Sequence, residues 1–421
     1  MRAAIRHLTC RSINRSHARC ALGIVLLVVA SVLSVTPLTR AAEPLDVNRI
    51  HAATNRGLEW LVAQQHPDGA WRSTSYTQLN AGPGATALAA ATLAQLSRDE
   101  QPEALAPGVA PQAALKSALA YLLKNLAPAG HVRDASGANE YPTYAAALTL
   151  IALNKLPAAQ REPHAAAIRK MQAYLVAAQV TQPLPNKLAT ADDVGGWGLV
   201  GGDPTDPSSF RTSNVSTTRF ALEALQPVAA DHPETFERGK KSLARRQQAD
   251  GGFAFLSDPL DQLNKAGAND PPTPDAPFVA RSYGTTTADG LLALRACGIA
   301  DNNPHIAAAL AWLNAHPNVD AVPGFPNDEV STAMADGLYY YYAASLAHAM
   351  AAYPDADFAR QAPALAAELL ARQRADGSWA NPISTMREDD PLVATTLALN
   401  ALATLPSSQP ETKTKPADQR E

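Results

Sequence analysis

The sequence has 421 residues and a formal net charge of −4, with 46% hydrophobic and only 6% aromatic residues. This length can bury a large core, as one big domain or as two ordinary ones. An acidic chain lacks the basic surface that nucleic-acid phosphates require, which argues against nucleic acid as a partner.

Residues 1–41 have the layout of a secretory signal. Arginines without any acid precede an apolar run over residues 21–35, and Thr39-Arg40-Ala41 forms a small-x-small cleavage site. The run is short for a transmembrane helix. We therefore expect an exported protein, periplasmic or extracellular, that is not integral to the membrane once the signal is cleaved. An uncleaved anchor is the alternative.

Cleavage would remove six arginines and no acids, which moves the formal charge from −4 to −10. It would also remove Cys10 and Cys20 and leave Cys297 as the only cysteine. Neither an intramolecular disulfide nor a multi-cysteine zinc site can then form. The histidines show no metal-ligand spacing, and we expect neither a metal nor a cofactor.

One motif, Gln-x-x-Asp-Gly-x-aromatic, recurs at residues 65–71, 247–253 and 373–379, each time after an Ala/Leu-rich stretch. Each copy is followed by a second apolar helix, and weaker copies fill the gaps. The second helices are expected over residues 85–96, 144–156, 216–225, 286–297, 338–350 and 393–402. Equivalent positions in the first helices are Trp60, Tyr121, Tyr174, Ser242, Trp312 and Glu368, which are 61, 53, 68, 70 and 56 residues apart. This periodicity predicts six helical hairpins.

The distribution of charge assigns each helix to one side of a ring. The second helices have almost no charged residues and should be buried inside, whereas the first helices carry a charged face and should lie outside. The basic run at Arg238, Lys240, Lys241, Arg245 and Arg246 is interpreted as such a solvated face. Residues 45–406 are therefore expected to form an all-α, single (α/α)6 toroid. The Gln and aromatic residues of the motif are interpreted as staples between hairpins.

Two segments fall outside this repeat. Residues 256–282, rich in proline and aspartate, lie between the helices of the fourth hairpin. They form either a lid over the ring or a surface loop, and the loop is favoured. The polar tail, residues 407–421, is expected to be disordered.

The stretch Arg56-Gly57-x-x-Trp60-Leu61-x-x-x-Gln65-x-x-x-Gly69-x-Trp71 resembles the QW repeat of squalene and oxidosqualene cyclases. The chain also resembles exported bacterial proteins with prenyltransferase/squalene-oxidase repeats and no established activity. Tyr283-Gly284, Gly337-Leu-Tyr-Tyr-Tyr-Tyr and Met386-Arg-Glu-Asp-Asp-Pro carry that likeness. Triterpene cyclases hold two toroids and this chain has room for one, like a prenyltransferase β-subunit.

The resemblance implies two kinds of chemistry that can be compared with these residues. Class II cyclases protonate an alkene with the middle acid of Asp-x-Asp-Asp, which matches Arg387-Glu388-Asp389-Asp390 except at the leading position. Asp389 is then the candidate acid beside Asp390, although a neighbouring arginine favours the carboxylate over the neutral acid. Asp390 precedes Pro391 and is also expected to be a helix N-cap. Protein prenyltransferases need Asp-x-Cys for zinc, but Arg295 stands two residues before Cys297, so this pair is missing.

Polar residues at the starts of the inner helices are expected to converge on one end of the central cavity. These starts are Thr143, Ser213-Asn214, Ser216–Thr218, Thr285–Thr287, Ser331-Thr332 and Asp389-Asp390. Tyr339 and Tyr342 share a helix face and either line the cavity or pack in the core. The candidate ligand-binding residues are Tyr144, Ser216, Thr217, Phe220, Thr286, Asp289, Asp336, Tyr339, Tyr342 and Thr395.

Three functions remain open. The first is an exported toroid that binds a small apolar, isoprenoid-like or extended ligand, with catalysis unproven. The second is a class II terpene cyclase, an isomerase, with Asp389 as general acid. The third is a polysaccharide hydrolase or lyase with Asp289, Asp336 and Asp389 as candidate carboxylates.

Overall fold

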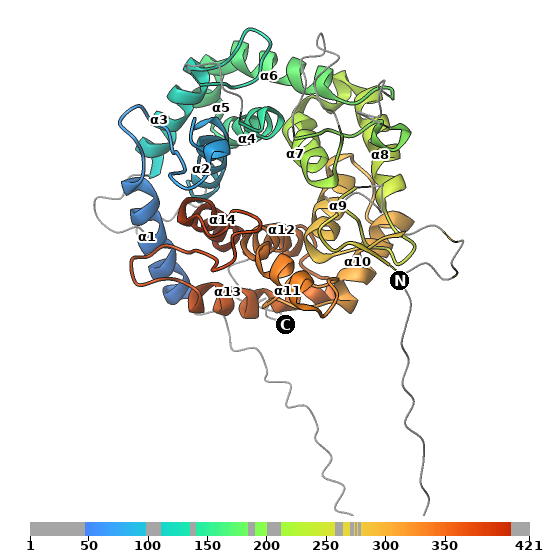
Figure 1. Ribbon diagram of the computed structural model, residues 1–421. Helices are drawn as coiled ribbons and strands as arrows, with labels where there is room; N and C mark the ends of the chain where they lie inside the picture. Colours follow the sequence, from blue (N-terminus) through green and yellow to red (C-terminus); the bar gives the residue numbers. More distant parts are fainter. Residues whose placement is uncertain are drawn as a thin grey trace, which may run out of the picture. The chain divides into compact units, whose positions relative to one another are not determined.

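The computed structural model describes residues 47–97, 111–134, 140–183, 190–199, 212–256, 264–269, 273, 276 and 279–405. Within these residues, long helices alternate between an outer and an inner ring (Figure 1). The outer helices are α1 (Val47–Ala63), α3 (Pro111–Lys124), α6 (Ala165–Ala178), α8 (Pro233–Arg246), α10 (Pro304–Ala315) and α13 (Ala362–Ala371). The inner helices are α2 (Pro83–Leu96), α4 (Pro142–Lys155), α7 (Val215–Leu225), α9 (Gly284–Ala296), α12 (Tyr339–Ala352) and α14 (Pro391–Thr404). The all-α toroid of helical hairpins is confirmed.

The chain divides into two units, residues 1–41 and 42–421, and the ring belongs to the second. The expected signal, with Cys10 and Cys20, and the expected tail at 407–421 lie outside the described residues. Each inner helix packs against the next in chain order, and α14 packs against α2, which closes the ring. Helix α1 packs against both α13 and α14 at this seam.

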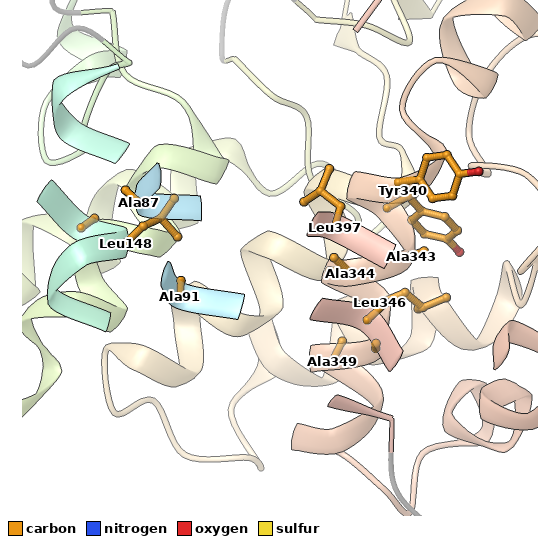
Figure 2. Packing of buried hydrophobic residues seen from close by; sticks show 14 of the residues in the cluster. Ala87, Ala91, Leu148, Tyr340, Ala343, Ala344, Leu346, Ala349 and Leu397 are labelled. Atoms are coloured by element: carbon orange, nitrogen blue, oxygen red, sulfur yellow. The ribbon is translucent and has the colours of Figure 1, made fainter. Parts of the chain in front are cut away.

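The inner helices pack closely because their facing residues are small. Ala87 and Ala91 of α2 lie beside Leu148 of α4, and Ala344 of α12 lies near Leu397 of α14 (Figure 2). All five side chains are largely buried. Alanine adds no rotamer entropy to a helix and leaves room for a neighbouring backbone. A continuous apolar core therefore runs around the ring, as expected for helices buried on both sides.

Glutamines at the ends of four outer helices connect each hairpin to the next. The Nε2 of Gln65 donates to the carbonyls of Gly69 and, in α3, Ala114 (2.9 and 3.0 Å). Gln373 makes the equivalent bonds to Gly377 and, across the seam, to Ala53 of α1 (2.9 and 2.8 Å). Gln179 and Gln247 repeat the pattern with α8 and α10. The predicted role of Gln65, Gln247 and Gln373 as staples is confirmed, and Gln179 makes the same kind of bonds.

A threonine in the first turn of an inner helix holds the aromatic residue of each motif. The Oγ1 of Thr86, Thr218, Thr287 and Thr395 accepts the backbone N–H of Trp71, Trp197, Phe253 and Trp379 respectively, at 2.9–3.0 Å. Thr286 donates to the carbonyl of Phe253. The hydroxyls of Thr286 and Thr395, two candidate ligand-binding residues, therefore bond the backbone of the motif and hold the hairpin together.

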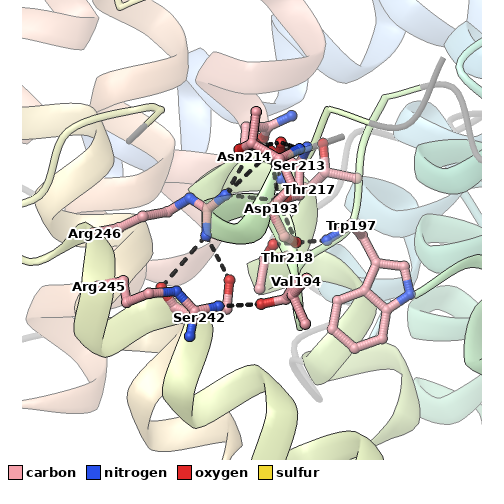
Figure 3. A network of polar contacts seen from close by, with 11 residues as sticks. Asp193, Val194, Trp197, Ser213, Asn214, Thr217, Thr218, Ser242, Arg245 and Arg246 are labelled. Carbon is pink, nitrogen blue, oxygen red and sulfur yellow. Dashed lines mark hydrogen bonds and ion pairs between the residues drawn. The ribbon is translucent and has the colours of Figure 1, made fainter. Parts of the chain in front are cut away.

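The expectation that the basic residues of α8 form a solvated face is wrong for Arg246. Its side chain is buried and bonds Ser242 and Ser213, with Asp193 at 3.6 Å (Figure 3). The Asp193 carboxylate in turn accepts from Ser213 N (2.8 Å). Burial lowers the pKa of Arg246 to about 10, so the side chain still carries its charge at neutral pH. Arg246 therefore points inward from the last turn of α8, whereas Arg245 beside it stays exposed.

Shorter elements complete the ring. They are α5 (Ala158–Arg161), α11 (Glu329–Asp336) and the 3-10 turns η1 (Thr77–Leu79), η3 (Glu162–His164), η5 (Ala191–Asp193), η6 (Gln226–Asp231) and η7 (Asp357–Gln361), with the antiparallel pair β1 (Ala268–Asn269) and β2 (Val279–Ala280). The expectation that Ser331-Thr332 begins the fifth inner helix is wrong. Both belong to α11, which Asp328 caps through Ser331 N (2.9 Å).

Candidate functional site

A cavity of about 530 Å³ lies inside the inner ring and takes residues from every inner helix. This volume falls in the ordinary range of small-molecule pockets, roughly 300–1,000 Å³. Its walls are mostly apolar, with Leu88, Leu148, Ile151, Phe220 and Leu397 among them. The cavity can therefore accept the hydrocarbon part of a ligand.

The inner helices begin side by side at one end of the cavity, which we call the mouth. Glu140, just before α4, accepts the N–H groups of Gly82 and Gly84 at the start of α2 (3.0 and 3.1 Å). Glu388, just before α14, accepts those of Tyr340 and Tyr341 at the start of α12 (both 2.8 Å). Neighbouring helix starts thus share capping groups, and the inner helices begin at one end as predicted, except that the fifth begins at Tyr339 and not at Ser331-Thr332.

The opposite end, which we call the far end, is formed by the last turns of four inner helices. Lys155, Glu223, His348 and Asn400 line the cavity there. The Nε2 of His348 lies 2.9 Å from the Oδ1 of Asn400. At about 1.5 Å of rise per residue, the eleven residues from Tyr144 to Lys155 in α4 separate the two ends by about 16 Å. The cavity therefore has an apolar middle between two polar ends.

Asp289 joins three inner helices behind the cavity wall. Its carboxylate is fully buried and accepts hydrogen bonds from Ser216 (2.5 Å), Tyr341 (3.0 Å), Arg219 (2.7 Å) and Ser345 (2.8 Å). These donors come from α7 and α12, on either side of α9. Asp289 itself does not line the cavity. Both of its oxygens accept hydrogen bonds from neighbouring helices, so Asp289 holds α7, α9 and α12 together.

Arg219 completes this network at the cavity wall. Its Nε donates to Glu223 Oε1 (2.9 Å), and its guanidinium lies 4.8 Å from the ring centre of Phe220. Burial alone would lower the pKa of Arg219, but the carboxylates of Glu223 and Asp289 together raise it. The arginine is therefore permanently charged and paired with two acids.

The structure separates the candidate acids. Asp390 is buried, caps α14 through Leu392 N (2.9 Å) and accepts from Ser73, which confirms the predicted N-cap. Asp389 accepts the hydroxyl of Tyr76 and does not line the cavity. Asp336 is exposed at the end of α11. Asp289, Asp336 and Asp389 therefore do not face one another across the cavity, and a catalytic role for Asp389 stays a prediction.

Three of the ten candidate ligand-binding residues line the cavity: Tyr144, Ser216 and Phe220. The rings of Tyr144 and Phe220 pack 5.3 Å apart. Tyr339 and Tyr342 do not line it, because their hydroxyls donate outward to the carbonyls of Val319 (3.0 Å) and Asn318 (2.6 Å). Among the tyrosines at the start of α12, Tyr341 faces the cavity. Thr217 and the four others named above, Thr286, Asp289, Asp336 and Thr395, are likewise absent from the lining.

Glu388 is a cavity residue that the sequence analysis did not select. Burial raises its pKa to about 8, although the N–H groups of Tyr340 and Tyr341 lower it. Much of the Glu388 population is therefore protonated at neutral pH. In the sequence, Glu388 is marked only by its position within Arg387-Glu388-Asp389-Asp390, whose third residue, Asp389, matches the acid of class II cyclases.

Two non-glycine residues of the described chain, Tyr141 (φ 46°) and Arg387 (φ 66°), have left-handed backbone. Both line the cavity at its mouth. The guanidinium of Arg387 lies 5.6 Å from the ring centres of Tyr76 and Tyr141. Such conformations cost on the order of 1–3 kcal/mol and cluster at ligand-binding sites. The mouth is therefore the strained part of the described ring.

Comparisons with known proteins support the fold and leave the activity open. No family model matches the chain, and no curated protein matches it. A protein from Actinoplanes of known structure is 18% identical, with a TM-score of 0.53 over 84% of this chain and 99% of that one. A variant of the type II terpene cyclase MstE from Scytonema is 17% identical, with a TM-score of 0.51 over 85% and 97%. The GH76A α-1,6-mannanase from Salegentibacter sp. HEL1_6 is 12% identical, with a TM-score of 0.50 over 84% and 98%.

These neighbours show that the chain has the α/α toroid of terpene cyclases and of a glycoside hydrolase. Within the described residues, no helix combines the length and the apolar character needed to span a bilayer. The same residues contain no group of three or more His, Cys, Asp or Glu side chains that is placed to hold a metal ion.

His348 should make the protein less stable in acid. Burial, followed by the Arg219 and Lys155 cations, lowers the pKa of His348 to about 3. The unfolded chain binds a proton near pH 6.5, so its contribution to stability is present above that pH and is lost as the pH falls. We expect the protonation of His348 in the unfolded chain to lower the free energy of unfolding by about 2 kcal/mol between pH 7 and pH 5.

Urea denaturation of the wild type and of His348→Gln at both pH values measures this effect. Glu388 acts in the opposite direction. Its pKa is higher in the folded protein than in the unfolded chain, so the stability that it contributes is lost as the pH rises. The difference between the two proteins therefore isolates His348. Equal losses in the wild type and the variant would contradict the prediction.

Proposed function

We propose that the protein is exported and binds an elongated, mainly apolar ligand of isoprenoid type in the cavity of its ring. The observation that carries the proposal is a cavity of about 530 Å³ with an apolar middle and two polar ends. An apolar pocket with a few polar groups at fixed places is the usual form of a small-molecule site. Export rests on the signal-like residues 1–41.

The neighbours are consistent with this class of ligand. Variants of MstE with TM-scores of 0.50 hold geranylgeranyl dihydroxybenzoate, their substrate, or merosterolic acid A, their product. The α-1,6-mannanase shares the fold equally well. The apolar wall of the present cavity favours the isoprenoid over the sugar, because a sugar needs many hydrogen-bond partners along its length.

A substitution that fills the cavity should abolish binding without unfolding the ring. Leu148 projects from α4 into the cavity, so the larger ring of tryptophan would occupy the space of the ligand. We expect Leu148→Trp to weaken farnesol binding, measured by isothermal titration calorimetry, by at least about tenfold, which is about 1.4 kcal/mol. The side chain of Val330 is 73% exposed on α11, and Val330→Trp is the matched control.

Farnesol and the longer geranylgeraniol are the probes, and mass spectrometry of lipid that co-purifies with the full chain is the independent measurement. Saturable binding that Leu148→Trp removes and Val330→Trp preserves supports the proposal. Failure of the wild type to bind either alcohol, together with the absence of any co-purified lipid, would refute it.

A second candidate function is acid-initiated cyclisation of such a ligand, and Glu388 favours it. The residue lines the cavity and its raised pKa, about 8, keeps a proton available at neutral pH. Alkene protonation needs a neutral acid in contact with the substrate. Gas chromatography of geranylgeranyl probes after incubation tests for a cyclic product. Loss of product in Glu388→Gln but not in Asp389→Asn would assign the acid to Glu388, and the reverse to Asp389.

A further inference from the structure

The side chain of Arg387 crosses the mouth of the cavity and contacts two aromatic rings. It lies in the loop before α14, yet its guanidinium reaches the ring of Tyr141 at the start of α4, and on another side that of Tyr76, both at 5.6 Å. Helix α2 lies between α14 and α4 in the ring. The side chain therefore spans the start of one inner helix to reach the next.

Within the described residues, the guanidinium of Arg387 makes neither a hydrogen bond nor an ion pair. The two acids that follow it in the chain have other partners. Both oxygens of Glu388 accept N–H groups from α12, and Asp389 accepts the hydroxyl of Tyr76. Arg387 therefore keeps its positive charge and its five N–H donors available at the cavity wall.

The contacts of Arg387 determine what it can bind. An arginine held by aromatic rings loses little further freedom when its N–H groups pair with an anion. Those donors form a planar fork that matches the two oxygens of a carboxylate or phosphate. The inner helices also begin at this end, and the positive ends of their dipoles add to the attraction for an anion.

Backbone strain supports the same conclusion. Arg387 and Tyr141, which contact each other, are the two non-glycine residues with positive φ in the described chain. Strain of this kind persists where the surrounding structure holds a residue in a required orientation. Here it turns the side chain of a loop residue towards the cavity.

We propose that Arg387 binds the anionic head group, a carboxylate or a phosphate, of an amphiphilic isoprenoid whose hydrocarbon tail extends into the apolar middle of the cavity. This inference rests on the proposed function and makes the ligand more specific. The ligand enters with its head at the mouth, and its tail points towards the far end at Lys155 and His348. Glu388 lies beside the first carbons of the tail.

The experiment compares ligands with the same tail and different heads. Farnesol, farnesoic acid and farnesyl phosphate are titrated calorimetrically into the full chain at low salt. One charge-assisted interaction at a partly buried site corresponds to a preference of about 10- to 100-fold. We expect the wild type to prefer the acid or the phosphate over the alcohol by this factor, and inorganic phosphate alone to bind far more weakly.

Arg387→Gly is the decisive variant, because glycine accepts positive φ without strain. It should lose the preference for the anionic head, keep the affinity for farnesol and melt within about 3 °C of the wild type. Arg387→Lys keeps the charge but loses the planar fork, so its preference should be intermediate. Lys155→Gln removes an equal charge at the far end and should leave the preference intact.

The outcomes separate the two proposals. If none of the three farnesyl probes binds the wild type, the proposed function fails. If farnesol binds but the anionic probes bind no more tightly, or if Arg387→Gly retains the preference, the assignment of Arg387 alone is wrong. It is also overturned if Lys155→Gln abolishes the preference, or if inorganic phosphate binds as tightly as farnesyl phosphate.

Discussion

Replacing Asp289 by alanine should lower the free energy of unfolding by about 3–5 kcal/mol, the usual effect of breaking a buried ion pair. The change leaves the Arg219 guanidinium, which is nearly inaccessible, with Glu223 as its only acidic partner in the described residues. It also leaves the hydroxyls of Ser216, Ser345 and Tyr341 without their acceptor. Equilibrium denaturation in urea measures the loss.

Two further variants identify the cause of this destabilisation. Asp289→Asn keeps an acceptor oxygen and should recover part of the loss, so the remainder reports the missing charge. Asp357→Ala removes an exposed partner of Arg360, at 3.2 Å, and should change the stability by less than about 1 kcal/mol. If Asp289→Ala were as mild as Asp357→Ala, the network would not connect the inner helices energetically.

The second large effect is expected at the seam of the ring, where Trp379→Ala should also lower the unfolding free energy by about 3–5 kcal/mol. Trp379 is fully buried, and its Nε1 donates to the carbonyl of Leu369 (2.7 Å). Its ring lies against Gly57 of α1, where an added Cβ would be 2.5 Å from a ring carbon. Its removal opens a cavity between the last hairpin and the first.

Trp60 provides the matched control. It lies on the same helix, α1, but is only partly buried, so Trp60→Ala should lower the unfolding free energy by less than Trp379→Ala. Thermal and urea denaturation of the two variants compares them directly. Equal losses would show that the burial of Trp379 against Gly57 does not determine the effect.

The ring was predictable because its determinants are local and repeated. A Gln-x-x-Asp-Gly-x-aromatic motif, a charged first helix and an uncharged second helix recur, and each repeat builds the same hairpin. The staples at Gln65 and Gln373 followed from the same pattern. The motif and the charge pattern depend on residues close together in the chain, although the staple at Gln373 bonds a residue 320 positions away.

The lining of the cavity was harder to predict because it depends on rotation about helix axes. Adjacent residues in a helix point about 100° apart, so an error of one residue exchanges Tyr341 with Tyr342. Carbonyls of residues 318 and 319, in a loop 24 and 20 residues before the tyrosines that they hold, settle the rotation of α12 by accepting from Tyr342 and Tyr339. At the mouth, likewise, Glu388 and not Asp389 reaches the cavity, directly after the positive φ of Arg387.

The closure between Gln373 and Ala53 joins residues 320 positions apart, and this separation has a kinetic consequence. Contacts between distant residues slow folding because the intervening chain must be ordered first. Until α14 has been made and has docked on α2, the apolar flank of the first hairpin stays uncovered. A partly synthesised chain is then exposed to aggregation for most of its length. We therefore expect the ring to close as a late, collective event, although its hairpins are built one at a time.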